Sequence, residues 1–324
     1  MPIKPILQRI LHNGGGLRLI RWQNGSRNRI LTYHNFHSVG TEDFEKQCEH
    51  FRHDYNPVSL DEVAAFVRHG KALPRNSVAV TVDDGYRDFY LYAYPVLKRY
   101  SIPATVFLMT DFLDCRAWPW WDQLRYAFFH TPLNSVSLRI AEGRQMPHRL
   151  LDPASREMAF EETVEALKSV PNSDRLAFIA DLPEAFQVNM PADPPPGLEP
   201  MTWDEVREMA LNGISFGPHT KSHPILASLE SEEQLREEIE GSKLRVQEEL
   251  GRAPAHFCYP NGRRVDIDER VRSAVERAGF LTALSTESGW NEAGSDPYLL
   301  KRLSMKPSLS TFFFRQQLAG FRVK

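Results

Sequence analysis

The sequence predicts an α/β fold in which a parallel sheet is covered by helices. Short apolar runs, rich in β-branched and aromatic residues, alternate with stretches of helical spacing. Continuous rather than alternating apolar runs are typical of strands buried on both faces, as in parallel sheets. The chain has 324 residues, and a closed α/β barrel can accommodate this length as one domain.

The alternation is interrupted by one irregular region in the middle of the chain. Residues 115–200 carry an aromatic cluster, helical stretches and a proline-rich joint, and we interpret them as an inserted, mainly helical subdomain. The barrel then comprises residues 29–114 and 201–324. Its expected strands are 29–34, 77–82, 104–109, 214–219, 256–260 and 281–286, and its expected helices are 41–52, 60–70, 86–100, 203–213, 231–251 and 268–279.

Composition argues against two classes of protein. The formal net charge is -3, with 39 basic and 42 acidic residues, whereas a nucleic-acid binder usually shows a basic excess. The three cysteines include no C-x-x-C pair, so neither a thiolate zinc site nor a disulfide framework is indicated. Free thiols in a reducing compartment are the simpler interpretation.

Residues 1–28 combine apolar and basic side chains without the apolar core of a secretory signal. This segment could lie as a short helix on an anionic membrane surface. Ordinary packing of a terminal helix on the barrel is the alternative. We expect a cytoplasmic protein, with the inner face of the cytoplasmic membrane as the place where the segment would act.

Asp83 and Asp84 follow the apolar strand at 77–82, at the end where barrel enzymes gather their catalytic groups. Adjacent carboxylates repel each other, and a core has no need of both. One of them suits a helix N-cap. A metal would instead draw one into coordination and leave the other as a base. The pair by itself leaves capping and function equally open.

His219 and His223 follow another expected strand, and their spacing places both imidazoles on one side if the segment forms a helical turn. Two imidazoles and a carboxylate make a three-ligand set with open positions for water, which is typical of a catalytic metal. A lone histidine is more often structural, but this combination favours one divalent metal ion. Zinc suits the set, with cobalt, iron or nickel as alternatives.

Asn261 and Gly262 are expected to form a tight turn after the strand at 256–260. A turn is a sufficient explanation of these residues, although a backbone N–H there could face a reacting oxygen.

Aromatic residues near the motifs are candidates for substrate binding. Tyr86 and Tyr259 lie next to the motifs and are expected to line the pocket. Trp290 is a candidate for stacking on a sugar ring, as are Trp118, Trp120 and Trp121. Ordinary packing is the alternative for each tryptophan.

Two of these segments resemble the polysaccharide deacetylase family, whose domain is called the NodB-homology domain (carbohydrate esterase family 4). Thr81-Val82-Asp83-Asp84-Gly85 resembles its T-F-D-D-G motif, and His219-Thr220-Lys221-Ser222-His223 matches its H-[ST]-x-x-H motif. The resemblance covers about residues 30–113 and 201–303. It implies a distorted (β/α)7 barrel and metal-assisted removal of N-acetyl groups from amino sugars.

The resemblance also implies residue roles. Asp84, His219 and His223 would bind the metal ion. Asp83 would be the general base that activates a water, and the backbone N–H of Asn261 would help to hold the oxyanion.

The sequence departs from the family pattern at two places. The usual third motif carries an arginine where this chain has Cys258, and the usual last motif carries a histidine that residues 299–304 lack. Both departures resemble the branch that acts on poly-N-acetylglucosamine and related exopolysaccharides. In that branch a Tyr-His pair ends the first strand, and Tyr33-His34 fits this place.

These departures imply two substitute roles. His34 would be the acid that protonates the leaving nitrogen. Arg302 would supply the missing guanidinium as a bidentate partner of Asp83.

The expected substrate is an N-acetylated glycan, a lipid-linked oligosaccharide or a nucleotide sugar of exopolysaccharide or cell-surface polysaccharide biosynthesis. Acetate and a free amino sugar would be the products. An amidase acting on a non-sugar amide is one alternative. A catalytically silent glycan-binding module is another, which the missing histidine of the last motif keeps open.

Overall fold

Seven parallel strands form the main sheet in the part of the chain that the structure, a computed structural model, describes: residues 15–36, 41–140 and 143–321. Their order across the sheet is β7-β4-β3-β1-β10-β9-β8, and the two-residue strand β2 (Asn56–Pro57) pairs with β3. The strands are β1 (Arg29–Tyr33), β3 (Ser77–Val82), β4 (Ala104–Leu108), β7 (Ile214–Pro218), β8 (His256–Cys258), β9 (Thr282–Ser288) and β10 (Leu300–Ser304).

The sheet curls into a nearly closed barrel whose seam lies between β7 and β8. These two edge strands lie side by side but share no hydrogen-bonded ladder in the described chain. Gly217 makes the close approach feasible, because a Cβ atom there would lie 2.4 Å from the carbonyl oxygen of His256. The predicted α/β barrel is confirmed.

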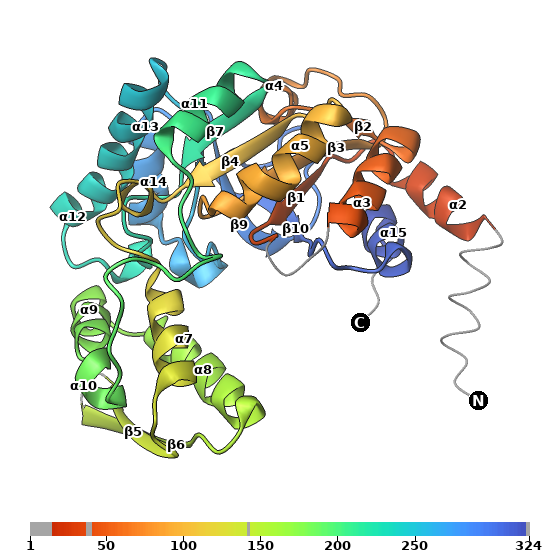
Figure 1. Cartoon of the computed structure of the whole chain (residues 1–324). Helices are drawn as coiled ribbons and strands as arrows, with labels where there is room; N and C mark the ends of the chain where they lie inside the picture. The colour runs from red at the N-terminus through yellow and green to blue at the C-terminus, as the bar shows by residue number, and fades with distance from the viewer. Residues whose placement is uncertain (1–14, 37–40, 141–142, 322–324) are drawn as a thin grey trace.

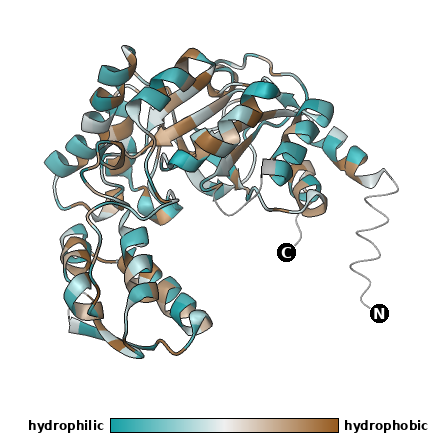
Figure 2. Cartoon of the chain, viewed as in Figure 1, coloured by the Kyte–Doolittle hydropathy of each residue, from teal (hydrophilic) through white to brown (hydrophobic). Residues whose placement is uncertain are grey.

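Helices cover the outside of the barrel (Figure 1). Figure 2 shows hydrophobic residues concentrated in the strands, while the outward helix faces are mostly hydrophilic. Capping boxes begin two of the predicted helices. The hydroxyls of Ser59 and Thr202 accept from the backbone N–H groups of Glu62 and Glu205, whose carboxylates accept from the backbone N–H groups of Ser59 and Thr202. The main helices of the barrel are α3 (Thr41–Asp54), α4 (Leu60–His69), α5 (Tyr94–Arg99), α11 (Trp203–Leu211), α12 (Glu232–Arg236), α13 (Ser242–Leu250) and α14 (Glu269–Arg277).

The segment expected to form the insertion folds as a smaller lobe below the barrel in Figure 1. It has its own hydrophobic core, which includes Leu124, Phe128 and Phe186. A β-hairpin in it was not predicted. The elements of the lobe are α7 (Trp120–His130), β5 (Ser135–Ile140), β6 (Arg144–Arg149), α8 (Pro153–Leu167), α9 (Asn172–Ala180) and α10 (Leu182–Phe186).

Polar contacts from α8 and the start of α9 help to connect this lobe to the barrel. Arg263 Nη1 lies 3.2 Å from Glu165 Oε2, and Ser173 donates to Glu230 Oε1 at 2.5 Å. They place α8 and the start of α9 over the carboxyl ends of the strands.

The chain ends also contribute helices. α2 (Gly16–Gln23) contacts α15 (Thr311–Ala319) near the amino end of β1. Residues 1–14 of the segment expected to contact a membrane lie outside the described residues. Among the helices of the described ranges, none has the length and hydropathy needed to traverse a bilayer.

Candidate metal centre and catalytic cavity

Three buried side chains converge at the carboxyl ends of β3 and β7. Asp84 Oδ1 lies 3.7 Å from His219 Nε2 and 3.8 Å from His223 Nε2. These distances are too long for hydrogen bonds. They are close to the separation of roughly 3.4 Å expected between ligands that each bind a tetrahedral zinc at ~2.1 Å. The arrangement therefore fits the predicted ligand set.

The backbone of the ligand loops is unusual. Asp84, Thr220 and His223 adopt positive φ angles of 76°, 66° and 59°, a region that non-glycine residues rarely occupy. The condition that His219 to His223 form a helical turn is not met, because β7 is followed by an irregular loop. The loop is fixed by the His223 N–H, which donates to Thr220 Oγ1 at 3.0 Å. The two imidazoles thus converge through a strained turn and not through helical periodicity.

The two histidines are held differently. His219 Nδ1 lies 2.8 Å from the carbonyl oxygen of Cys258, so that Nδ1–H donates and Nε2 presents its lone pair. His223 Nδ1 is buried and has no hydrogen-bond partner in the described chain. Its ring instead packs edge-on against Trp121, with centroids 4.6 Å apart.

Trp121 is itself fixed by a polar chain. Its Nε1–H donates to the hydroxyl of Tyr86 at 3.1 Å, and this hydroxyl donates to Asp122 Oδ2 at 2.5 Å. Tyr86 is two residues from Asp84, and Trp121 belongs to α7 of the insertion. The insertion therefore supports His223 through Trp121, and it holds Tyr86 beside the Asp84 loop.

The protonation states favour a cation here. Burial lowers the pKa of His219 to about 4 and holds the pKa of His223 well below its usual value, so both imidazoles are neutral and can act as ligands. Burial and the neighbouring Asp83 raise the pKa of Asp84 well above its usual value. A cation would offset the cost of ionising Asp84. The residues therefore fit a divalent metal ion.

A second combination of potential ligands is less suitable. Asp83, His219 and Cys258 also lie within reach of one another. Burial raises the pKa of the Cys258 thiol well above its usual value, whereas a metal needs the thiolate. Asp83 is in addition already paired with Arg302.

Asp83 is buried and ionised. Arg302 Nη1 lies 2.8 Å from Asp83 Oδ1. Burial acts to raise the pKa of Asp83, but the Arg302 guanidinium, together with the neighbouring His219 and His34, holds this pKa well below its usual value.

The bidentate pairing predicted for Arg302 is wrong. Its Nη2 has no hydrogen-bond partner in the described chain, and its Nε donates to the carbonyl of Ser285. Nη1 also reaches the hydroxyl oxygens of Thr32 and Thr81. Arg302 thus holds Asp83 through one nitrogen and is fixed by the strands around it.

Sequence reasoning missed Thr32 and Thr81. Thr32 donates to Asp83 Oδ2 at 3.3 Å, and the two threonines are paired in register on β1 and β3. A detectable signal existed, because each is a polar residue within an otherwise apolar strand.

Asp83, Asp84, His219 and His223 line a cavity of about 330 Å³ between the barrel and the insertion. His34 faces this cavity with 44% of its side chain exposed, and its Nε2 lies 3.8 Å from Asp83 Oδ2. Tyr259, Asn261 and Thr286 line the barrel side. The cavity residues contributed by the insertion, which the sequence did not identify as a group, are Trp120, Trp121, Phe160, Val164 and Lys168.

Asn261 adopts φ 54° in the loop after β8, and its carbonyl accepts from Thr286 Oγ1 at 2.6 Å. No acceptor for its backbone N–H is found within the described ranges. The N–H is therefore available to a ligand, as an oxyanion donor must be.

Two predicted substrate-binding residues lie elsewhere. Trp290 stacks on the Arg29 guanidinium, 4.3 Å from the ring centroid, at the amino end of β1 and outside the cavity lining. Tyr86 is buried behind Trp121 and holds the cavity wall from outside. Among the aromatic residues named as candidates for substrate binding, Tyr259, Trp120 and Trp121 line the cavity, and Trp118 does not.

Known proteins share sequence and fold with this chain. The sequence model of the polysaccharide deacetylase family matches residues 70–128 and 181–283, which together are half of the chain. The chain belongs to the polysaccharide deacetylase family. The family match includes residues 115–128 and 181–200, which lie outside the ranges that the motifs covered. It is interrupted between residues 128 and 181.

Two individual relatives show the extent of the sequence similarity. The chain is 22% identical over 298 residues to YxkH of Bacillus subtilis (strain 168), covering 90% of this chain and 76% of that protein. It is 39% identical over 70 residues to the poly-beta-1,6-N-acetyl-D-glucosamine N-deacetylase of Escherichia coli (strain K12). That match covers 21% of this chain but only 10% of the E. coli protein.

Solved structures share the fold. The Streptococcus pyogenes deacetylase PplD, in complex with acetate, superposes with a TM-score of 0.60 and 19% identity over 91% of this chain and 99% of that one. IcaB from Ammonifex degensii gives a TM-score of 0.58 and 18% identity, over 92% and 97% of the two chains. These structures confirm the expected fold, and the E. coli match confirms the expected similarity to a poly-N-acetylglucosamine deacetylase.

Trp121→Ala is expected to weaken metal binding about 10- to 100-fold, as is typical when a residue that orients a ligand is removed. The reason is that His223 would lose the ring that replaces its missing hydrogen bond. Competition with a chromogenic chelator measures this affinity directly. Trp118→Ala, which removes a tryptophan that contacts Tyr126 instead, is the matched control. Equal metal affinities for the two variants would contradict the role of Trp121.

Proposed function

We propose that this chain is a metal-dependent N-deacetylase that hydrolyses the acetamido group of an amino sugar and releases acetate. The observation that carries the proposal is the convergence of Asp84, His219 and His223 in a cavity that also presents Asp83 and His34. A divalent cation held by these ligands would polarise the acetyl carbonyl and lower the pKa of a coordinated water to ~7.

The proposed roles of the chain's own residues follow from position. Asp83, kept ionised by Arg302, takes the proton of the attacking water through Oδ2, its cavity-facing oxygen. The free N–H of Asn261 donates to the oxyanion that forms on the carbonyl carbon.

His34 is the proposed source of the leaving-group proton. Its Nε2 lies 3.8 Å from the same Asp83 oxygen, on the cavity surface. Desolvation lowers the pKa of His34, so the resting imidazole is neutral. The proton that Asp83 accepts can therefore pass to His34 and then to the departing nitrogen.

The insertion forms the opposite wall of the proposed substrate site. Phe160, Val164 and Lys168 recur at four-residue spacing along one face of α8 and its end. Together with Trp120 and Trp121 they offer aromatic and apolar surface, which suits the faces of sugar rings. We propose an N-acetylated glycan or a lipid-linked or nucleotide-linked precursor as the substrate.

Release of acetate tests the proposal. The chelated protein and its zinc-, cobalt- and nickel-loaded forms would be incubated with N-acetylglucosamine oligomers, a nucleotide-linked N-acetyl sugar and small non-sugar amides. We expect metal-dependent acetate release from at least one sugar and none from the small amides. Preference for small amides would favour an amidase. Binding of glycans without acetate release by any metal form would favour the silent module and overturn the proposal.

Arg302→Ala is expected to lower the free energy of unfolding by about 3–5 kcal/mol, because it leaves the buried Asp83 carboxylate without its cation. It should also reduce kcat more than it changes KM, since Asp83 would no longer be held ionised. Urea unfolding and steady-state kinetics measure the two effects. Arg302→Lys, which retains the charge, should have a kcat between those of Arg302→Ala and the wild type. An unchanged kcat/KM in Arg302→Ala would contradict the role of Arg302.

A further inference from the structure

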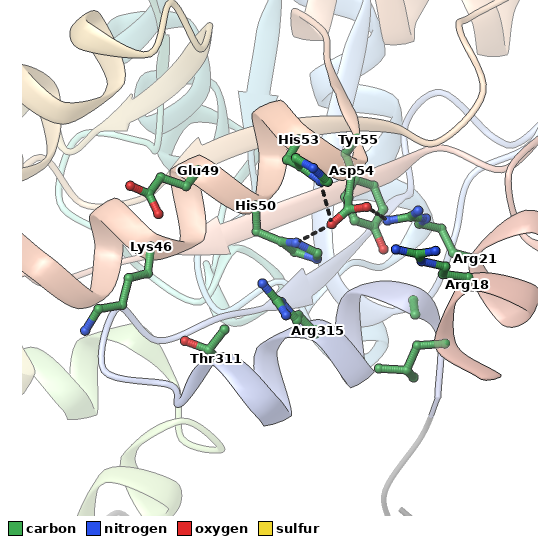
Figure 3. A pocket seen from close by; sticks show the side chains of 12 residues that line it. Arg18, Arg21, Lys46, Glu49, His50, His53, Asp54, Tyr55, Thr311 and Arg315 are labelled. Carbon is green, nitrogen blue, oxygen red and sulfur yellow. Dashed lines mark ion pairs between the residues drawn. The ribbon is translucent and has the colours of Figure 1, made fainter. Parts of the chain in front are cut away.

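A second cavity lies between α2, α3 and α15, on the side of the barrel away from the insertion (Figures 1 and 3). Its volume is about 570 Å³, which is in the range of small-molecule sites. It shares no lining residue with the catalytic cavity. A ligand bound here would therefore not be the substrate of the proposed reaction.

The two carboxylates of this cavity are already engaged. Asp54 forms an ion pair with Arg21, and its Oδ2 lies 2.8 Å from His50 Nδ1. Glu49 accepts a hydrogen bond from the Tyr100 hydroxyl at 3.1 Å. Asp54 is thus neutralised by Arg21, whereas Glu49 keeps its negative charge, because the Tyr100 hydroxyl is a neutral donor.

Cations outnumber these carboxylates. Arg18, Arg21, Lys46 and Arg315 line the cavity, and Figure 3 shows Arg18, Arg21 and Arg315 reaching toward the region of His50 and Asp54. Lys46 is paired with Asp43 at 3.1 Å. Arg18 and Arg315 are the two cations of the lining without an ion-pair partner in the described residues, and the lining keeps a positive excess even when Glu49 is counted.

The guanidinium groups of Arg18 and Arg315 have no ion-pair or hydrogen-bond partner in the chain as described. For Arg315 this includes a buried Nε, which is shielded from solvent without an acceptor. A buried donor without an acceptor is costly. Since guanidinium groups match the geometry of oxyanions, an anion between them would relieve both this cost and the repulsion of like charges.

The walls are suited to a larger ligand than a bare ion. His50 is only 7% exposed, and its ring is fixed between Tyr55 and Phe314, with centroids 5.5 and 6.0 Å away. Leu17, Tyr55 and Ala319 add apolar lining. The cavity therefore combines an oxyanion site with room for an attached organic group.

We infer that the α2–α3–α15 cavity binds the phosphate group of a phosphate monoester. The charge of such a group, about −1.5 to −2 at neutral pH, suits two guanidinium groups that have no ion-pair partner in the described chain. The phosphate belongs either to a soluble small molecule or to the headgroup of an anionic phospholipid. The inference is independent of the proposed deacetylation.

Binding of two probes to the full chain tests this inference. Phenyl phosphate, measured by titration calorimetry, represents the soluble source. Vesicles of phosphatidic acid, compared with phosphatidylcholine vesicles in a flotation assay, represent the lipid source. The variants are Arg315→Ala and Arg18→Ala, of which the second removes an exposed side chain and leaves the core intact. Arg139→Ala, which removes an exposed arginine from β5 of the insertion, is the control.

We expect at least one probe to bind the wild type and the Arg139→Ala control equally. Arg315→Ala and Arg18→Ala should each weaken this binding about tenfold or more, because each removes a charged hydrogen bond. Binding of phenyl phosphate would indicate a soluble ligand, and binding of phosphatidic acid vesicles alone would indicate a headgroup. Absence of binding to both probes, or binding that neither variant weakens, would overturn the inference.

Discussion

His223→Ala is expected to lower acetate release by roughly 10³-fold or more. With two ligands left, the cation would be lost or misplaced, and the pKa of the attacking water would stay far above the value of ~7 that a bound metal gives. The Asp84 carboxylate would face the same buried site with one imidazole fewer. Metal analysis after dialysis and the rate of acetate release measure the two effects together.

His148→Ala is the matched control for this variant. His148 is a buried histidine of the insertion that packs against Phe128 and does not line the catalytic cavity. It should cost stability but leave metal content unchanged. If His223→Ala retained both stoichiometric metal and wild-type activity, the metal centre described here would be refuted.

Asp83→Asn is expected to reduce kcat by about 10²- to 10⁴-fold, the usual contribution of a general base. The amide keeps the shape of the side chain and can still accept from Thr32, but it cannot take a proton. Metal content should not change, because Asp84, His219 and His223 remain. Steady-state kinetics on the metal-loaded variant measure the effect.

Asp266→Asn separates catalysis from simple loss of an ion pair. Asp266 is likewise buried and paired with an arginine, Arg263, at 3.0 Å, but it lies outside the catalytic cavity. Both variants should lose stability, and only Asp83→Asn should lose kcat by orders of magnitude. Comparable kcat values in the two variants would exclude Asp83 as the base.

The barrel was predictable because its strands carry a strong local signal. The runs at 77–82 and 104–109 are buried at every position, as their continuous apolar character indicates. β10 was missed, because its buried Arg302 interrupts the apolar pattern. The hairpin was missed because β6, with the sequence RQMPHR, has no strand signal of its own and depends on its pairing with β5.

The candidate site was predictable where two residues share a short motif. Asp83 with Asp84, and His219 with His223, are local in sequence, and parallel strands bring their ends to one edge. The contributions of Trp121, Phe160 and Lys168 depend on how the insertion folds back over the barrel, which no local pattern encodes. Trp290 was misassigned for the same reason, since the loop after β9 returns its side chain to Arg29.

The seam of the barrel gives the proposed cation a second consequence. His219 follows β7, and its Nδ1 hydrogen bond to Cys258 reaches the end of β8, where the sheet has no ladder. An ion bound to His219 and Asp84 would link the ends of β7 and β3, and it would hold in place the imidazole that reaches β8. Ligand binding to the folded state raises its stability by mass action, so a bound ion would slow amide-hydrogen exchange in β7 and β8. The free energy of unfolding would then depend on the concentration of free metal around the protein.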